Sequence, residues 1–264
     1  MKIRPDVDLA NLTDTGNVRS ENEDYYCYLE PASDEEFDRK GRLIAIADGM
    51  GGHAGGKIAS TLALDALRAV FENGSESGPS ETLVSGFAHA QRSILSHIES
   101  HPELDGMGTT CTAAILHRGH LFYGHIGDSR LYLLHEGKFA PVTEDHSLVN
   151  QLVQSGALTP DQAAHHQQKN VLTRALGMKS SEVAADFSNQ PIPLSPGDAL
   201  VLATDGLHGV VSTEEIGALV ATQSPYDACR ALVATAKERG GLDNITVQIL
   251  RLQANRSQSR MEDS

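Results

Sequence analysis

"RLIAIADGMGGHAGGKIAS", residues 42–60, carries an apolar run directly into Asp48-Gly49, and four more glycines follow before a helical pattern begins. A second stretch, "DALVLATDGLHGVV" at residues 198–211, repeats this arrangement and leads an apolar run into Asp205-Gly206. Short apolar runs that end at glycine are typical of buried β-strands. The sequence therefore predicts two buried strands, each of which ends at an Asp-Gly pair.

The composition is that of one sizeable domain with an acidic surface. The chain has 264 residues, of which 40% are hydrophobic, and its net charge is −14. A chain of this length can bury a large core, whereas its charge argues against nucleic-acid binding. No apolar run approaches the roughly 18 residues that cross a bilayer, and the N-terminal residues lack the apolar segment of a secretory signal. We expect a monomer with no nucleic-acid or membrane partner.

The three cysteines, Cys27, Cys111 and Cys229, show neither CxxC pairing nor an even count. This pattern argues against a disulfide framework and against a zinc site. Unpaired cysteines are typical of a reducing compartment, so the expected location is the cytoplasm.

Apolar runs predict eight strands, and amphipathic patterns predict four helices. The helices cover residues 57–71 and 81–100 and follow the N-cap residues Ser212 and Ser224. Two strands flank the turn-like sequence of residues 127–129, which predicts a β-hairpin. Because strands and helices do not alternate strictly, the order favours an α+β fold with antiparallel sheets covered by helices. The predicted strands are residues 7–12, 25–29, 43–47, 111–117, 121–126, 130–134, 199–203 and 246–250.

Two segments show little apolar pattern. Residues 147–170 are polar and rich in Gln and His, which predicts a mobile surface excursion. Residues 253–264 are also polar, which predicts a disordered tail. We therefore expect one domain over residues 1–252, with no linker that divides it.

Carboxylate side chains lie at strand ends or tight turns in five places. A single Asp-Gly is more often a structural turn than a metal ligand, but five such places together favour a cation site. Mg²⁺ and Mn²⁺ prefer oxygen ligands, typically one or two carboxylates and several waters for each ion. Glycine after an aspartate also lets a backbone carbonyl approach the ion. The carboxylates are those of Glu21, Glu23, Asp24, Asp48, Asp128, Asp205 and Asp243.

The glycine-rich loop allows a second interpretation, a nucleotide-binding P-loop. From Gly51 to Lys57 the chain spells GxxxxGK between a predicted strand and a predicted helix. However, Ile58 stands where a P-loop has the Ser or Thr that binds magnesium. A P-loop NTPase is therefore the weaker alternative.

Eight short motifs, taken in their order along the chain, resemble the metal-dependent (PPM, type 2C) protein serine/threonine phosphatases in their bacterial form. The resemblance covers about residues 13–250, and its specificity comes from the order of the motifs rather than from any single one. It implies a four-layer αββα sandwich, in which helices flank two antiparallel sheets, with a binuclear Mn²⁺ or Mg²⁺ centre at one end. The motifs are "VRSENED", "IADGMGGHAGG", "GTT", "GDSR", "DHSLV", "LTRALG", "ATDGL" and "GLDNITV".

The resemblance also implies how the ions are held. Asp48 would bridge both ions, and the carbonyl oxygen of Gly49 would complete one coordination sphere. Asp205 and Asp243 would bind the other ion directly. Asp128 and Asp205 together would offer a weaker third metal site.

Other residues of the motifs would act around the ions. Glu23 and Asp24 would act largely through metal-bound waters, and Arg19 would bind the substrate phosphate, which suits a guanidinium group. Residues 147–170 would form the variable flap beside the active site. The residues expected to tie the ligand-bearing turns together are Thr109, Thr110, Ser129 and Asn244.

The implied reaction is the hydrolysis of phosphoserine and phosphothreonine in proteins, which would reverse the action of Ser/Thr kinases. Two ions would activate a water that attacks phosphorus in line, without a covalent enzyme intermediate. Many eukaryotic members have a histidine that protonates the leaving group where this chain has Met50. We expect a water to take that role, with His53 as the alternative. A partner-switching phosphatase that acts on an anti-sigma antagonist and a catalytically silent, metal-bound scaffold also stay open.

Overall fold

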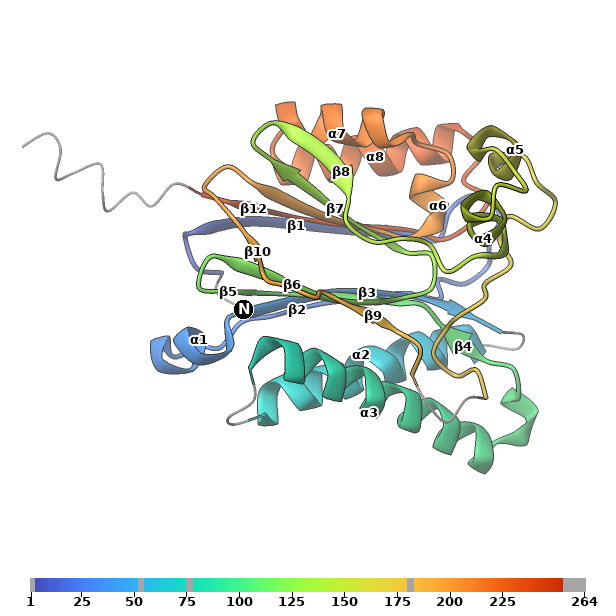
Figure 1. Ribbon diagram of the computed structural model, residues 1–264, viewed down its shortest axis with the longest axis horizontal. Helices are drawn as coiled ribbons and strands as arrows, with labels where there is room; N and C mark the ends of the chain where they lie inside the picture. The colour runs from blue at the N-terminus through green and yellow to red at the C-terminus, as the bar shows by residue number, and fades with distance from the viewer. Residues whose placement is uncertain (1–2, 52–54, 75–77, 180–182, 254–264) are drawn as a thin grey trace, which may run out of the picture.

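The computed structural model describes residues 3–51, 55–74, 78–179 and 183–253. Two antiparallel β-sheets are stacked on each other, and helices cover the outer face of each sheet (Figure 1). This is the α+β, four-layer αββα sandwich that the sequence predicts. Within the described ranges, no helix is long and apolar enough to cross a membrane.

The two sheets together contain all eight strands that the sequence predicts and four short ones that it does not. The first sheet has the strand order β1 (Val7–Asp14), β12 (Ile245–Leu252), β11 (Ala199–Ala203), β7 (Arg130–His135) and β8 (Lys138–Pro141). The second has the order β10 (Ile192–Pro193), β6 (His120–Ile126), β5 (Cys111–His117), β3 (Arg42–Met50) and β2 (Asp24–Leu29), while β4 (Gly108–Thr109) pairs with β3 and β9 (Asp186–Phe187) with β6.

The long helices form the two outer layers. The second sheet is covered by α2 (Gly55–Asn73) and α3 (Pro79–Ser100), and the first by α7 (Thr213–Thr222) and α8 (Pro225–Glu238). Ser212 and Ser224 cap α7 and α8 as predicted, since each hydroxyl accepts a backbone N–H three residues later. The remaining helices are short: α1 (Asp34–Lys40), the 3₁₀ helix η1 (Pro102–Leu104), α4 (Leu148–Gln154), α5 (Pro160–Ala164) and α6 (Asp205–His208).

The strands that lead to the two Asp-Gly pairs are buried on both faces. On β3, Leu43 and Ala45 face the core under α2 and α3, while Ile44 and Ile46 face the core between the sheets. On β11, Val201 belongs to the core under α7 and α8, and its neighbours on either side face the other sheet. A strand between two apolar layers needs apolar residues at every position, which explains the continuous runs in the sequence.

The predicted hairpin around residues 127–129 is wrong. The strand before this turn, β6, pairs with β5, β9 and β10 in the second sheet, whereas β7 pairs with β8 and β11 in the first. The turn therefore carries the chain from one sheet to the other. A tight turn between two strands with apolar residues looks the same in the sequence whether the strands pair with each other or with different partners.

The excursion predicted over residues 147–170 contains two short helices that its weak pattern did not indicate. The hydroxyl of Ser147 caps α4, and Thr159 and Gln162 form a capping box at the start of α5. Both helices lie at the same end of the sandwich as α6 (Figure 1). They therefore stand beside the ends of the strands that carry the predicted metal ligands. Most of the predicted tail, residues 254–264, lies outside the described residues.

Candidate metal centre

The carboxylates predicted at strand ends come together where the two sheets meet. In the second sheet, Asp24 at the start of β2 pairs in register with Asp48 near the end of β3. In the first sheet, Asp205 is the first residue of α6 and is separated from β11 only by Thr204, and Asp243 precedes the neighbouring strand β12. Asp128 lies in the turn between the sheets. Three separate parts of the fold thus contribute carboxylates to one site.

Asp24 ties the two sheets together. Its Oδ2 accepts hydrogen bonds from the hydroxyls of Thr246, at 2.6 Å, and Thr204, at 2.9 Å, both of which belong to the side of the first sheet. Its Oδ1 is buried and has no hydrogen-bond partner within the described residues, and the same holds for Oδ1 of Asp205. A buried carboxylate oxygen without a partner is costly, so both atoms are suited to meet a cation or its bound water.

Four carboxylates of the cluster, two of them buried and two partly buried, hold their protons more tightly than usual. The pKa of Asp24 is raised to about 7, that of Asp128 to about 8 and that of Asp205 to about 6, while the pKa of Asp48 lies well above its usual value. Burial is the largest cause for all four, and the charges of neighbouring carboxylates raise these pKa values further. The negative charges crowded into this site lack enough positive charge to balance them.

Arg19 lies at the exposed edge of the cluster, where it pairs with Asp243. Its Nη2 donates to Oδ2 of Asp243 at 2.8 Å, and half of its side chain is exposed. This hydrogen bond is the main reason why the pKa of Arg19 is raised. The other carboxylate oxygen of Asp243 accepts the backbone N–H of Asn244. The guanidinium group is thus held next to a predicted metal ligand, with part of its surface open to solvent.

The hydroxyl and amide residues expected to support the turns do so. The carbonyl of Asp48 accepts the Thr109 hydroxyl at 2.8 Å and the Thr110 N–H at 2.9 Å, and the Thr110 hydroxyl accepts the N–H of Asp48. The hydroxyls of Thr110 and Ser129 are 2.8 Å apart, which links Asp48 to the turn of Asp128. On the other side, the amide oxygen of Asn244 accepts the N–H of Glu23. Hydrogen bonds to the backbone therefore fix Asp48 and Glu23, two of the predicted metal-binding residues.

In the two Asp-Gly pairs, glycine is required because other backbone segments pack closely against it, and not because of a turn conformation. A Cβ on Gly49 would lie 2.0 Å from the carbonyl oxygen of Gly56 at the start of α2. A Cβ on Gly56 would in turn lie 2.6 Å from Oε1 of Glu23, whose pKa is raised mainly by burial. Similarly, a Cβ on Gly206 would lie 2.0 Å from the carbonyl of Asn244. The glycines permit the backbones to approach closely around the carboxylates.

Several residues that hold the site were missed by sequence reasoning. The imidazole Nε2 of His208 donates to the backbone carbonyl of Asp128 at 2.9 Å, and burial is the main reason why the pKa of His208 falls to about 3. Nδ1 of His146 accepts the N–H of Gly127, and its Nε2 faces Asp186 at 3.0 Å. His146 lies inside the motif "DHSLV", and His208 directly follows the motif "ATDGL". Their position in or beside these motifs was the only signal, since neither histidine belongs to a local pattern.

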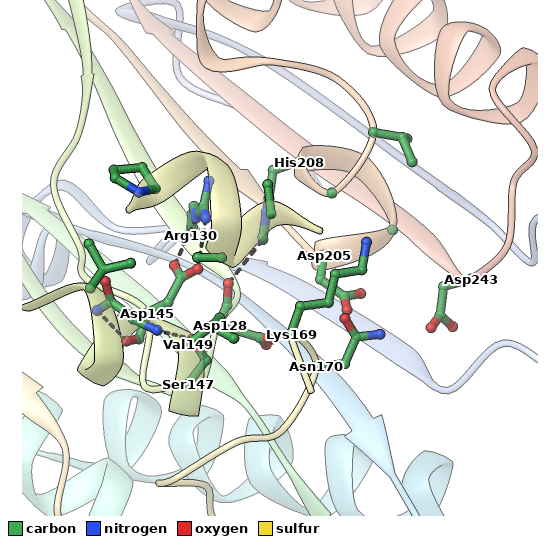
Figure 2. A pocket seen from close by; sticks show the side chains of 18 of the residues that line it. Asp128, Arg130, Asp145, Ser147, Val149, Lys169, Asn170, Asp205, His208 and Asp243 are labelled. Carbon is green, nitrogen blue, oxygen red and sulfur yellow. Dashed lines mark hydrogen bonds and ion pairs between the residues drawn. The ribbon is translucent and has the colours of Figure 1, made fainter. Parts of the chain in front are cut away.

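A cavity of about 510 Å³ opens from the carboxylates toward the flap helices (Figure 2). Asp205 and Asp243 lie on one side of it, Val149 and Ser147 on the other, and Asp128 between them. The flap side includes an ion pair in which two nitrogens of Arg130 donate to the two carboxylate oxygens of Asp145, each at 2.7 Å. The remaining lining residues are Asn150, Val153, Pro160, Ala163, Ala164, Lys169, Asn170, Gly206, His208, Gly209, Val210 and Leu242.

The chemistry of this donor set fits hard divalent cations. Among the described residues, no three His, Cys, Asp or Glu side chains are grouped so as to hold one ion by themselves. Mg²⁺ and Mn²⁺ commonly use only one or two carboxylates and keep several waters, so such a group is not required. The candidate ligands are all oxygen atoms, and two of them are buried without partners. The site thus suits an oxygen-bound ion and not a zinc ion held by Cys and His.

Two predicted features cannot be placed. His53 lies outside the described residues together with residues 52 and 54, which belong to the loop of residues 51–57 that the P-loop interpretation depends on, while residues 55–57 begin α2. Met50 ends β3 as part of the same strand that carries Asp48. The other predicted site residues are all described and lie in or beside the carboxylate cluster.

Comparisons with known proteins agree with this geometry. The family model described as "Protein phosphatase 2C" matches residues 30–244. The chain is 36% identical over 249 residues to the protein phosphatase PhpP of Streptococcus pneumoniae, with 92% of this chain and 97% of that protein covered. Its fold is similar to the crystal structure of the Mycobacterium tuberculosis serine/threonine phosphatase PstP, with a TM-score of 0.83, 33% identity and coverage of 94% and 99% of the two chains.

A further similar structure is the catalytic domain of PstP solved in complex with two manganese ions. The TM-score is 0.80 and the sequence identity is 32%, and the match covers 94% of this chain and 99% of that one.

Proposed function

Because the chain belongs to the protein phosphatase 2C family of metal-dependent serine/threonine phosphatases, we propose that its carboxylate cluster holds two Mn²⁺ or Mg²⁺ ions for hydrolysis by a metal-activated water. The chain is a protein serine/threonine phosphatase, and its substrates are phosphoproteins. When bound, the ions would lower the pKa of a water and neutralise charge on the phosphoryl group. The side chains around the ions would orient their waters and bind the substrate phosphate.

The proposed ligands divide between the two sheets. Asp48 and the carbonyl of Gly49 come from the second sheet, and Asp205 and Asp243 from the first. With this ligand set, residues of both sheets would hold the ions, and Asp24 already joins the two sheets through the hydroxyls of Thr204 and Thr246. Asp24 and Glu23 would orient waters of the ions, which is supported by the unpartnered Oδ1 of Asp24.

A third ion is proposed at Asp128, close to Asp205. Repulsion from Asp205 is among the causes that raise the pKa of Asp128, which supports a short separation between the two carboxylates. His208 holds the backbone of Asp128 from the opposite side. This site would be weaker than the other two because it would share Asp205 with one of them.

Arg19 would bind the phosphate oxygens of the substrate. A guanidinium group has five N–H donors in a planar arrangement, and only one of its nitrogens is engaged with Asp243. The ion pair with Asp243 orients the side chain, while its exposed half is accessible to a substrate. For the leaving group, we propose that a water supplies the proton and that His53 does not.

Two further proposals concern the extent of the catalytic domain and the physiological role of the phosphatase. We propose that residues 1–252 form the catalytic domain and that residues 147–170 form its flap. The phosphatase would reverse the action of Ser/Thr kinases, which a comparison of phosphoproteins between a deletion strain and its parent would test.

The observation that carries the metal proposal is a cluster of four carboxylates with raised pKa values, of which Asp24 and Asp128 are buried, with two buried oxygens that have no partner among the described residues. The test measures both melting temperature and hydrolysis of p-nitrophenyl phosphate, in EDTA and then in Mn²⁺. We expect Mn²⁺ to raise the melting temperature and to restore an activity that EDTA removes. A raised melting temperature without hydrolysis would identify a silent scaffold, and full activity in EDTA would refute the metal centre.

A further inference from the structure

The cavity beside the carboxylates is much larger than a phosphate group requires. Its volume of about 510 Å³ lies within the range of pockets that hold whole small molecules. The carboxylates line only one side of it (Figure 2). The part that faces α4 and α5 has no role in the chemistry proposed above.

Four polar side chains on the flap side of this cavity already have partners. Arg130 and Asp145 bind each other through two hydrogen bonds, and the amide of Asn150 donates to the backbone carbonyl of Asp145 at 2.8 Å. The hydroxyl of Ser147 accepts the N–H that caps α4. A polar side chain of a substrate would therefore find few free donors or acceptors on this wall.

The rest of the flap-side wall is apolar. Val149 and Val153 lie one turn apart on α4, and Pro160, Ala163 and Ala164 belong to α5. Val149 is largely buried, so the wall is part of a packed structure and not a loose loop. The side chain of Lys169, which also lines the cavity, extends toward Asp205 in Figure 2.

From these observations we infer that the flap wall, defined as Val149, Val153, Pro160, Ala163 and Ala164, is a binding site for an apolar side chain of the phosphoprotein substrate. This inference rests on the proposed function, because the phosphorylated residue must reach the carboxylates of the same cavity. Neighbouring residues of a peptide are about 3.8 Å apart between Cα atoms. A residue next to the phosphorylated one therefore stays close to this cavity, and we expect its side chain to contact the flap wall.

The test uses three phosphothreonine peptides that differ only in the residue after the phosphothreonine, which is Leu, Ser or Asp. A second set varies the residue before it. We expect kcat/KM to be about tenfold or more higher for the Leu peptide of at least one set, mainly through a lower KM, as apolar pockets commonly discriminate. Equal values for the three peptides in both sets, or a preference for Asp, would overturn the inference.

Two variants test whether the preference for the Leu peptide comes from the flap wall. Val153→Asp puts a charge on it, and Ala163→Leu fills part of the cavity without adding a polar group. Both should reduce the preference for Leu over Asp to within about threefold. Val84→Asp is the matched control, since Val84 is an exposed valine on α3, which covers the second sheet, and it should keep the preference of the wild type.

Folding and the proposed function are checked separately. Melting temperatures show whether each variant is folded, and Ala163→Leu keeps the inference testable if Val153→Asp does not fold. A preference for Leu that persists in folded Val153→Asp and Ala163→Leu would refute the flap wall as its source. Failure of the wild type to hydrolyse p-nitrophenyl phosphate with Mn²⁺ would instead refute the proposed function, because that substrate has no neighbouring residue.

Discussion

Asp205→Asn should make the metal-free protein more stable, although Asp205 is a proposed metal ligand. The carboxylate lies in a cluster of like charges, and one of its oxygens has no hydrogen-bond partner in the described part of the chain. Burial, followed by the charge of Asp243, raises its pKa from the usual 3.8 to about 6. Without a cation, ionised Asp205 therefore opposes folding, and asparagine removes this charge at nearly constant shape.

The size of the effect follows from the pKa. A rise of about two pKa units corresponds to about 3 kcal/mol at a pH above both values. The side-chain amide that Asp205→Asn introduces will lack some of its hydrogen-bond partners, which costs about 1–2 kcal/mol of stability. The net gain is then about 1–2 kcal/mol, or about 2–8 °C in melting temperature for a domain of this size.

The sign of the pH dependence follows as well. The folded protein binds the proton of Asp205 more tightly than the unfolded chain does, so stability falls as pH rises through this interval. The penalty is absent below about pH 4, grows between about pH 4 and 6, and is complete above it. The advantage of Asp205→Asn over the wild type should therefore be present at pH 8 and small at pH 4.

The assay is thermal melting in EDTA at pH 4, 6 and 8, repeated at pH 8 with Mn²⁺. Mn²⁺ should raise the melting temperature of the wild type more than that of Asp205→Asn, because the variant has lost a charged ligand. Asp8→Asn, at an exposed aspartate of β1, is the control. It should change neither the melting temperature in EDTA nor the rise that Mn²⁺ causes. A metal-free Asp205→Asn protein that melts below the wild type at pH 8 would refute the account of repulsion at the site.

Three further predictions concern activity and packing. Asp243→Asn should lower kcat on p-nitrophenyl phosphate at least about a hundredfold in a folded protein, because it removes a charged ligand; steady-state kinetics with Mn²⁺ tests this. Gly49→Ala should lower the melting temperature by several degrees, since its Cβ would lie 2.0 Å from the Gly56 carbonyl and the backbones must shift; unchanged melting would contradict the close approach. His53→Ala should cost less than about tenfold on both p-nitrophenyl phosphate and a phosphopeptide, whereas a selective hundredfold loss on the phosphopeptide would make His53 the general acid.

The sequence predicts best those parts of the fold whose signal is local. The apolar runs at 43–47 and 199–203 identify strands because a strand buried on both faces needs apolar residues throughout. The short strands β4, β9 and β10 have two residues each, which is too few for any period to show. Helix α1 has a capping hydroxyl at Ser33 and an acidic first turn, but no buried residue, so its apolar pattern is missing.

Contacts between residues far apart in the chain are the part of the site that the sequence does not predict. The residue types and the strand ends predict which carboxylates belong to a metal centre, but not what holds them. Asp24 accepts hydrogen bonds from threonines 180 and 222 residues later in the chain. His208 likewise reaches back across 80 residues to the carbonyl of Asp128. No local pattern contains such pairs, so only the packed structure reveals them.

The wrong prediction of a hairpin at residues 127–129 shows that unpredicted contacts between distant residues also determine the functional site. A hairpin would have kept Asp128 at the edge of a single sheet, away from the carboxylates of the other. Because the chain instead passes between the sheets at this turn, Asp128 lies beside Asp205 and Asp24 lies across from Thr204. The end of the sandwich is thus joined by polar contacts and buried charge, where an apolar core would have been more stable. That cost is consistent with a site that cations complete, and it is the reason why removing one charge should stabilise the protein only when the cations are absent.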